Sequence, residues 1–342
     1  MNFETVWQVA TSGRLGALHA TIRASAPFYT IYFIVTAGQC GLLKLLSRGP
    51  HTAREIGRAL DIAEGDLDPL IAWLEVGVAL GELSLSGEQY SIAGSLAAAL
   101  SEPQHDALLA VLEEMAGLHA LLLRDTPGRL KQGQRLTLKD QDGEVIARSS
   151  RLLEPFVHEA IGRAIPMTGP VHVLEIGCGS GTYLCHMLKS NPEVRVHGIE
   201  LQPEVAELAR RNLQAWGVAE RATIEVQDVR ARPVGESFDV VTMHNNVYYF
   251  EESARSALFR QVAQHLRPGG TLLLSTACRG GSPGVALLNL WGAMTQGCGR
   301  LPTSEELCRQ LRLAGLVDAV AWNVGAPIES FWAFSAKRPH TL

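Results

Sequence analysis

The chain has 342 residues, of which 46% are hydrophobic and 19% are charged, and its formal net charge is −5. This composition excludes global disorder, and the length exceeds the roughly 250–300 residues that a single hydrophobic core usually supports. The negative charge excludes a bulk electrostatic attraction to nucleic acid or to anionic lipid.

The cysteines and the apolar runs indicate where the protein works. The six cysteines form no CxxC pair and no Cys/His metal spacing, which predicts free, mostly buried thiols in a reducing compartment. No secretion signal is recognised, so we expect a cytoplasmic protein. The most apolar run, FYTIYFIVTAG over 28–38, is about half a membrane span and predicts a buried helix without membrane contact.

Residues 1–100 have the pattern of a winged-helix domain. Helices are expected over 41–46, 52–60 and 66–80, with Thr52 as an N-cap, and two short strands are expected within 81–94. The third helix carries Asp66, Asp68 and Glu75, and no lysine or arginine occurs between residues 58 and 124. DNA binding requires cations against phosphate, so this module is expected to serve packing or dimerisation and to bind no nucleic acid.

Strands and helices alternate in the C-terminal half. Residues 101–165 read as a helical linker or lid, broken by a polar stretch over 126–144, and residues 166–342 read as one domain. Strands are expected over 171–177, 194–200, 222–228, 238–245 and 271–277, with helical patterns between them. This alternation predicts an α/β, Rossmann-like domain with a parallel sheet and helices on both faces.

A glycine-rich loop follows the first of these strands, in VLEIGCGSGT at 173–182. Its glycines are Gly177, Gly179 and Gly181, one residue short of the G-x-G-x-x-G dinucleotide fingerprint, and the Gly-Lys-Ser/Thr of a Walker loop is missing. Glu175 stands directly before the loop. A carboxylate is a poor neighbour for a diphosphate and a good one for an ammonium or sulfonium group.

Two further carboxylates follow the next strands. Glu200 ends the second strand, where it can accept both hydroxyl protons of a ribose. Asp228 ends the third strand and can accept a hydrogen bond from an adenine amino group. Since ligands of such sheets bind beyond the carboxyl ends of the strands, these acids and Glu175 are expected to share one site.

With these motifs the chain resembles class I S-adenosylmethionine-dependent methyltransferases. VLEIGCGSGT resembles their motif I, HGIEL their ribose-binding acid, VQDVR their adenine-side acid and LRPGGTLLLST the strand after these motifs. The whole chain resembles the small-molecule O-methyltransferases that form homodimers through a winged-helix domain. The resemblance implies a seven-stranded sheet whose last strand is antiparallel, adenosylmethionine as cofactor and adenosylhomocysteine as product. It also implies cofactor contacts from Glu175, Gly177, Gly179, Gly181, Glu200, Leu201, Asp228, Val229, His244 and Asn245.

The resemblance places the chemistry just beyond the strand 238–245. Tyr248 stands where the resembling O-methyltransferases carry a histidine base, and a tyrosine with a pKa near 10 is a poor base. Tyr248 could instead orient the acceptor, His244 could be the base, or the acceptor could be acidic enough to need none. Asn246 and Tyr249 are candidate substrate contacts. Arg151 is a further candidate, for a substrate carboxylate.

Several alternatives stay open on the sequence. O-methylation of a small molecule or a peptide end in secondary metabolism is favoured, with a carboxylate, acidic phenol or enol as acceptor; C- and N-methylation are the alternatives. No metal is expected, because YY at 248–249 replaces the His-Asp pair of metal-dependent relatives. The rivals from other classes are an NAD-dependent oxidoreductase and a ligand-sensing winged-helix regulator.

Overall fold

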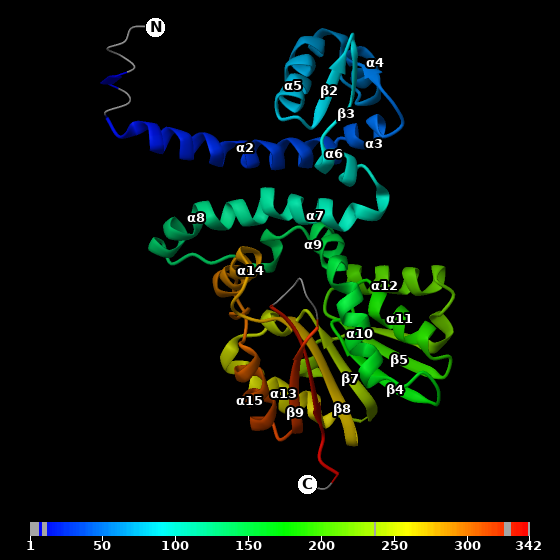
Figure 1. Cartoon of the computed structure of the whole chain (residues 1–342). Helices are drawn as coiled ribbons and strands as arrows, with labels where there is room; N and C mark the ends of the chain where they lie inside the picture. The colour runs from blue at the N-terminus through cyan, green and yellow to red at the C-terminus, as the bar shows by residue number, and fades with distance from the viewer. Residues whose placement is uncertain (1–6, 9–11, 236, 325–329, 341–342) are drawn as a thin grey trace. The chain divides into compact units, whose positions relative to one another are not determined.

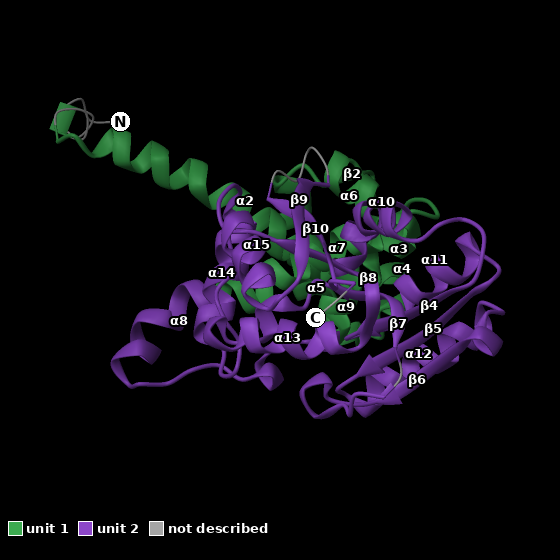
Figure 2. Cartoon of the chain, turned by 90° about the horizontal axis from the view of Figure 1, so that it is seen from below, with its two compact units in different colours: residues 1–120, 144–149 green, residues 121–143, 150–342 purple. Residues whose placement is uncertain are grey.

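The computed structural model describes residues 7–8, 12–235, 237–324 and 330–340. The chain divides into two compact units, coloured separately in Figure 2. The first contains residues 1–120 and 144–149, and the second contains residues 121–143 and 150–342. The three-part division at residues 100 and 165 stays a prediction. Within the described ranges, we find no helix with the length and hydropathy needed to cross a membrane.

The first unit combines helices with a small antiparallel sheet (Figure 1). Thr52 caps α4 through a reciprocal pair of hydrogen bonds with Glu55, as a capping box does. The strands lie in the order β1-β3-β2, and β2 and β3 form the hairpin. The elements are α2 (Arg14–Gln39), α3 (Leu42–Leu46), β1 (His51–Thr52), α4 (Ala53–Ala59), α5 (Leu67–Ala79), β2 (Leu83–Ser86), β3 (Gln89–Ile92), α6 (Ser95–Leu100), α7 (Asp106–Glu114) and α9 (Gly143–Ser150).

The apolar run 28–38 lies on α2 and is buried only in part, so the expectation of a buried helix is wrong for its first half. Phe33 and Ile34 belong to the core of this unit, with Leu42 and Leu74. The side chains of residues 28 and 29 are 55% and 54% exposed. Burial is confined to the C-terminal part of α2 because that part packs against the core of α3 and α5.

The second unit is a seven-stranded sheet with the order β6-β5-β4-β7-β8-β10-β9. The first five strands of this order are parallel, and β10 is antiparallel between β8 and β9. The predicted fold class is therefore confirmed. The strands are β4 (Val171–Ile176), β5 (Val194–Glu200), β6 (Ala222–Val226), β7 (Phe238–His244), β8 (Leu266–Ala277), β9 (Val317–Asn323) and β10 (Phe331–Lys337).

Helices cover both faces of this sheet (Figure 1). Helices α10 and α11 pack on one another on one side, and α13 and α15 pack on one another on the other. The helices of this unit are α8 (Ala120–Lys131), α10 (Glu154–Ala164), α11 (Thr182–Ser190), α12 (Pro203–Ala215), α13 (Arg255–Gln264), α14 (Pro283–Met294) and α15 (Ser304–Leu313). Both faces of β4 are buried except at His172, which explains its apolar sequence.

Strand β8 begins five residues before the expected strand at 271. Its first residues include Pro268, Gly269 and Gly270, which read locally as a turn. The ladder to β7 shifts register between Phe238 and Val240, so the irregular start of β8 is accommodated by a bulge.

Candidate active site

The glycine loop joins β4 to α11 at the carboxyl edge of the sheet. Gly177, Gly179 and Gly181 have φ angles of 70°, 53° and 84°, in the left-handed region that favours glycine. A Cβ atom at position 177 would lie 2.9 Å from the side-chain nitrogen of Asn246. The loop therefore requires glycine for its conformation and for the close approach of β7.

Glu175 is fully buried at the end of β4, under this loop. Neither of its carboxylate oxygens has a hydrogen-bond partner within the described ranges. Burial, and then the charge of Glu200, raise its pKa well above the usual value. A buried carboxyl without a donor is destabilising, so this position fits a ligand that carries a positive charge or hydrogen-bond donors.

Glu200 connects the end of β5 to the glycine loop. Its Oε2 accepts a hydrogen bond of 3.0 Å from the amide of Gly179, and its Oε1 accepts bonds from the amides of Leu201 and Gln202. The side chain of Leu201 is 54% exposed beside it. Glu200 therefore holds the loop while keeping acceptor capacity for a ligand.

Asp228, after β6, is paired within its own turn. Its carboxylate accepts hydrogen bonds from the backbone and from the guanidinium of Arg230, at 2.9 Å and 2.7 Å. The guanidinium hydrogen bond, first among several contacts, lowers the pKa of Asp228. Val229 is buried next to it. The structure thus brings Glu175 and Glu200 to the loop, and holds Asp228 one strand further along the same edge.

The end of β7 places three polar residues beside the loop. His244 is 5% exposed, and its Nδ1 lies 2.7 Å from the hydroxyl of Ser275, while its Nε2 is buried and has no partner among the described residues. Burial, with a smaller contribution from His158, lowers its pKa to about 3. Asn245 has a φ of 52°, which is uncommon outside glycine. The side chain of Asn246 donates a hydrogen bond to the carbonyl of Ile176 on β4.

Tyr248 and Tyr249 form an aromatic cluster with Trp291 of α14. The ring centroid of Trp291 lies 6.0 Å from that of Tyr248 and 5.3 Å from that of Tyr249, both edge to face. Tyr248 is 8% exposed. The cluster makes an apolar wall after β7, to which α14 contributes Trp291.

Arg151, proposed for a substrate carboxylate, lies on the surface just before α10. Its side chain is 58% exposed, and its Nε lies 3.7 Å from a carboxylate oxygen of Glu154. An ion pair whose arginine is this exposed contributes little to stability. The substrate role of Arg151 stays a prediction.

Tyr183, the second residue of α11, was not among the site residues predicted from the sequence. Its ring meets the ring of His244 edge to face, with 5.1 Å between the ring centroids. Burial, and then the charge of Glu175, raise the pKa of Tyr183. Tyr183 follows the last glycine of the loop by two residues, and that proximity is the one hint the sequence offers.

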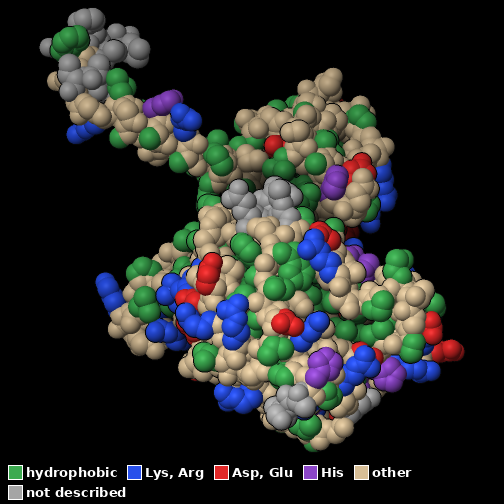
Figure 3. All heavy atoms as spheres, turned by 60° about the horizontal axis from the view of Figure 1, so that its bottom comes forward, with side chains coloured by type: hydrophobic (Ala, Val, Ile, Leu, Met, Phe, Trp, Pro, Cys, Tyr) green, Lys and Arg blue, Asp and Glu red, His purple; other side chains and the backbone are tan. Residues whose placement is uncertain are grey.

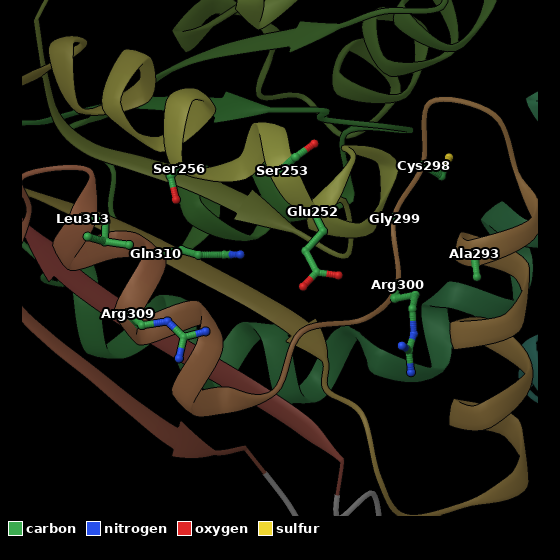
Figure 4. A pocket seen from close by; sticks show the side chains of 10 residues that line it. All are labelled: Glu252, Ser253, Ser256, Ala293, Cys298, Gly299, Arg300, Arg309, Gln310 and Leu313. Atoms are coloured by element: carbon green, nitrogen blue, oxygen red, sulfur yellow. The ribbon is translucent and has the colours of Figure 1, made fainter.

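A hollow of about 770 Å³ lies elsewhere in this unit (Figure 4). In Figure 4 the side chains of Glu252 and Gln310 extend toward one another across it. It is lined by residues after β7, after α14 and on α15, and the glycine loop does not contribute to it. The buried, unpaired carboxyl at Glu175 identifies the loop edge, and not this hollow, as the candidate site.

Comparison with known proteins agrees with this assignment. Residues 173–270 match the family model described as a methyltransferase domain. The chain contains a methyltransferase domain. The family resemblance predicted from the glycine loop is confirmed, and the matched residues run from β4 into β8.

Relatives and solved structures extend the similarity beyond the methyltransferase domain. The chain is 26% identical over 184 residues to demethylspheroidene O-methyltransferase of Rhodobacter capsulatus, which covers 52% of this chain and 45% of that protein. The structure of the mitomycin 7-O-methyltransferase MmcR superposes with a TM-score of 0.78 at 19% identity, over 96% of this chain and 99% of that one. The structure of human N-acetylserotonin methyltransferase in complex with SAM superposes with a TM-score of 0.75 at 16% identity, over 94% of this chain and 98% of that one. The chain spans about a quarter to just over half of the length of the curated relatives it matches.

Proposed function

We propose that the protein is an S-adenosylmethionine-dependent methyltransferase that methylates an oxygen atom of a small molecule in secondary metabolism. The observation that carries this proposal is Glu175, a fully buried carboxyl without a hydrogen-bond partner in the described structure, beneath a loop of left-handed glycines. The amino-acid end of adenosylmethionine carries an ammonium group that would satisfy it. The similarity to O-methyltransferases supports oxygen as the acceptor atom.

The residues at this edge fit the parts of the cofactor. The glycines allow its close approach, Glu175 fits the ammonium group, and Glu200 has acceptor capacity for the ribose hydroxyls. Leu201 offers an exposed apolar side chain for the adenine ring. When bound, adenosylmethionine supplies an electrophilic methyl group, and the chain's own task is to hold the acceptor in line with it and to exclude water.

The acceptor itself is expected to be acidic. With a pKa of about 3, His244 is neutral near pH 7 and is a weak proton acceptor. Tyr248 instead stands in the aromatic wall with Tyr249 and Trp291. We therefore infer that Tyr248 orients a planar acceptor, and that this acceptor is a carboxylate, an acidic phenol or an enol. A peptide end is the second class of acceptor.

The cofactor assignment can be tested without a substrate. The protein is denatured and searched by mass spectrometry for released adenosylmethionine or adenosylhomocysteine, and both are then titrated by calorimetry beside NAD. Micromolar binding of the adenosyl compounds without NAD binding is expected. Binding of NAD alone would refute the proposal in favour of an oxidoreductase. A panel of phenols and carboxylic acids, followed by mass gain of one methyl group, then tests the acceptor.

We also propose a homodimer that forms through the first unit. Residues 15, 18 and 22 of α2 are leucine and isoleucine side chains at helical spacing that are between 47% and 58% exposed. Figure 3 shows hydrophobic side chains, in green, at the surface of the face in view. Exposed apolar stripes of this kind mark interaction surfaces. Light scattering after size exclusion should give a dimer, and Leu18→Lys with Ile22→Lys should give a monomer. An unchanged dimer would exclude this surface.

The free thiols support a reducing, cytoplasmic location: four of the six cysteines are buried.

A further inference from the structure

Two histidine rings are stacked between α10 and α11. His158 of α10 and His186 of α11 have ring centroids 3.7 Å apart and planes 5° from parallel. The ring of Tyr183 meets His158 edge to face at 6.2 Å and meets His244 at 5.1 Å. The four rings therefore make a continuous row from α10 to the carboxyl end of β7, within the second unit.

Two ring nitrogens in this row, Nε2 of His244 and Nε2 of His158, lack a hydrogen-bond partner among the described residues, and that of His158 has no role yet. The Nε2 atom of His158 is buried and forms no hydrogen bond to any described residue. Burial, with a smaller effect of His186, lowers the pKa of His158 to about 4. At pH 7 the ring is therefore neutral, and a neutral imidazole can still donate one hydrogen bond. The stacking on His186 holds the ring in one orientation.

The charged and titratable groups around this row come from four elements of the second unit. Glu154 and His158 both lie on α10, and Tyr183 and His186 both lie on α11. His244 is the last residue of β7, and Glu175 lies at the end of β4. The charge of Glu175 raises the pKa of Tyr183, so Glu175 lies near the end of the row formed by Tyr183 and His244. An ionised Glu175 attracts cations. An amino acid carries its ammonium and carboxylate groups on the same carbon. A ligand whose ammonium group meets Glu175 therefore needs a hydrogen-bond donor close by for its carboxylate.

We propose that His158, held by its stack on His186, donates a hydrogen bond to the α-carboxylate of the amino-acid part of the methyl donor. This inference rests on the proposed function and adds a binding residue to it. His158 stands 17 residues before Glu175, outside the glycine-loop motif. Its role is to bind and position the cofactor, and it takes no part in the proton balance of methyl transfer.

Two ligands separate this role from a general effect on the fold. Adenosylhomocysteine carries the amino-acid part, whereas 5′-methylthioadenosine keeps the adenosine and lacks the amino acid. Both are titrated by calorimetry into the full-length protein and into His158→Phe, which retains a ring for stacking. His158→Gln retains a donor, and His172→Gln is the control, since His172 is exposed at the opposite end of β4.

We expect His158→Phe to weaken the binding of adenosylhomocysteine by about 10- to 100-fold, the usual effect of losing a hydrogen bond to a charged group. Methylthioadenosine should bind the variant and the wild type equally, His158→Gln should recover most of the affinity, and His172→Gln should behave as wild type. Unchanged binding of adenosylhomocysteine by His158→Phe, or an equal loss for both ligands, would overturn the inference.

A second measurement needs no variant. In the wild-type protein, nitrogen NMR of the histidine rings should show the Nε2 resonance of His158 shifting with adenosylhomocysteine and not with methylthioadenosine. Equal shifts with both ligands would contradict a carboxylate contact while leaving the proposed function intact. Failure of the wild type to bind either ligand would instead refute the proposed function, and this inference with it.

Discussion

Replacing Glu175 by Gln should stabilise the ligand-free protein and remove its binding of adenosylhomocysteine. The carboxyl of Glu175 is fully buried, is unpaired within the described structure and has a raised pKa. A carboxyl whose pKa rises on folding stays protonated in the folded protein after the unfolded chain has lost its proton. The stability that it contributes is therefore complete below the unfolded pKa, and it is lost as the pH rises through the folded pKa.

The magnitude follows from proton linkage. The unfolded pKa of a glutamate is about 4.3, and between this value and the folded pKa each pH unit removes about 1.4 kcal/mol of unfolding free energy. A glutamine at this position does not titrate, so it removes this slope. The difference between variant and wild type should therefore grow from pH 5 upward until the folded pKa is reached.

Urea unfolding at pH 5, 6, 7 and 8, followed by tryptophan fluorescence, measures this difference. Glu220→Gln is the matched control, because Glu220 is an exposed acid in the same unit. Excess adenosylhomocysteine should stabilise the wild type increasingly as the pH rises, since its ammonium group pairs with the ionised carboxylate, and should leave Glu175→Gln unchanged. Equal pH slopes for Glu175→Gln and wild type would refute the reasoning.

Three further substitutions test the loop and the aromatic wall. Gly177→Ala should lower the unfolding free energy by about 1–2 kcal/mol, the cost of a left-handed residue with a Cβ, and an unchanged urea midpoint would show that the loop relaxes. Glu200→Ala should weaken the binding free energy of adenosylhomocysteine by about 1–3 kcal/mol in calorimetry, the cost of leaving buried polar groups unpaired. An unchanged Kd would remove Glu200 from the site. Tyr248→Phe should lower turnover and leave the affinity for adenosylhomocysteine unchanged, and full turnover would remove its hydroxyl from the mechanism.

Local sequence determined the features that depend on neighbouring residues. Three glycines in five positions specify a left-handed loop because only glycine adopts that backbone without strain. The alternation of apolar strands and amphipathic helices determined the parallel sheet, and that sheet in turn brings Glu175 and Glu200 to one edge, since both end neighbouring parallel strands. These features were predictable from residues close together in the chain.

Tertiary structure decided which polar groups are paired and which side chains are covered. Asp228 and Glu200 were both predicted at the end of a strand, yet the carboxylate of Asp228 accepts a hydrogen bond from the guanidinium of Arg230. Phe28 was predicted to be buried and is 55% exposed, because only the C-terminal part of α2 packs against the core of the first unit. The row from His186 through His158 and Tyr183 joins two helices and a strand end that no motif connects. Pairing and burial depend on groups that are distant along the chain, and only the folded arrangement of strands and helices brings those groups together.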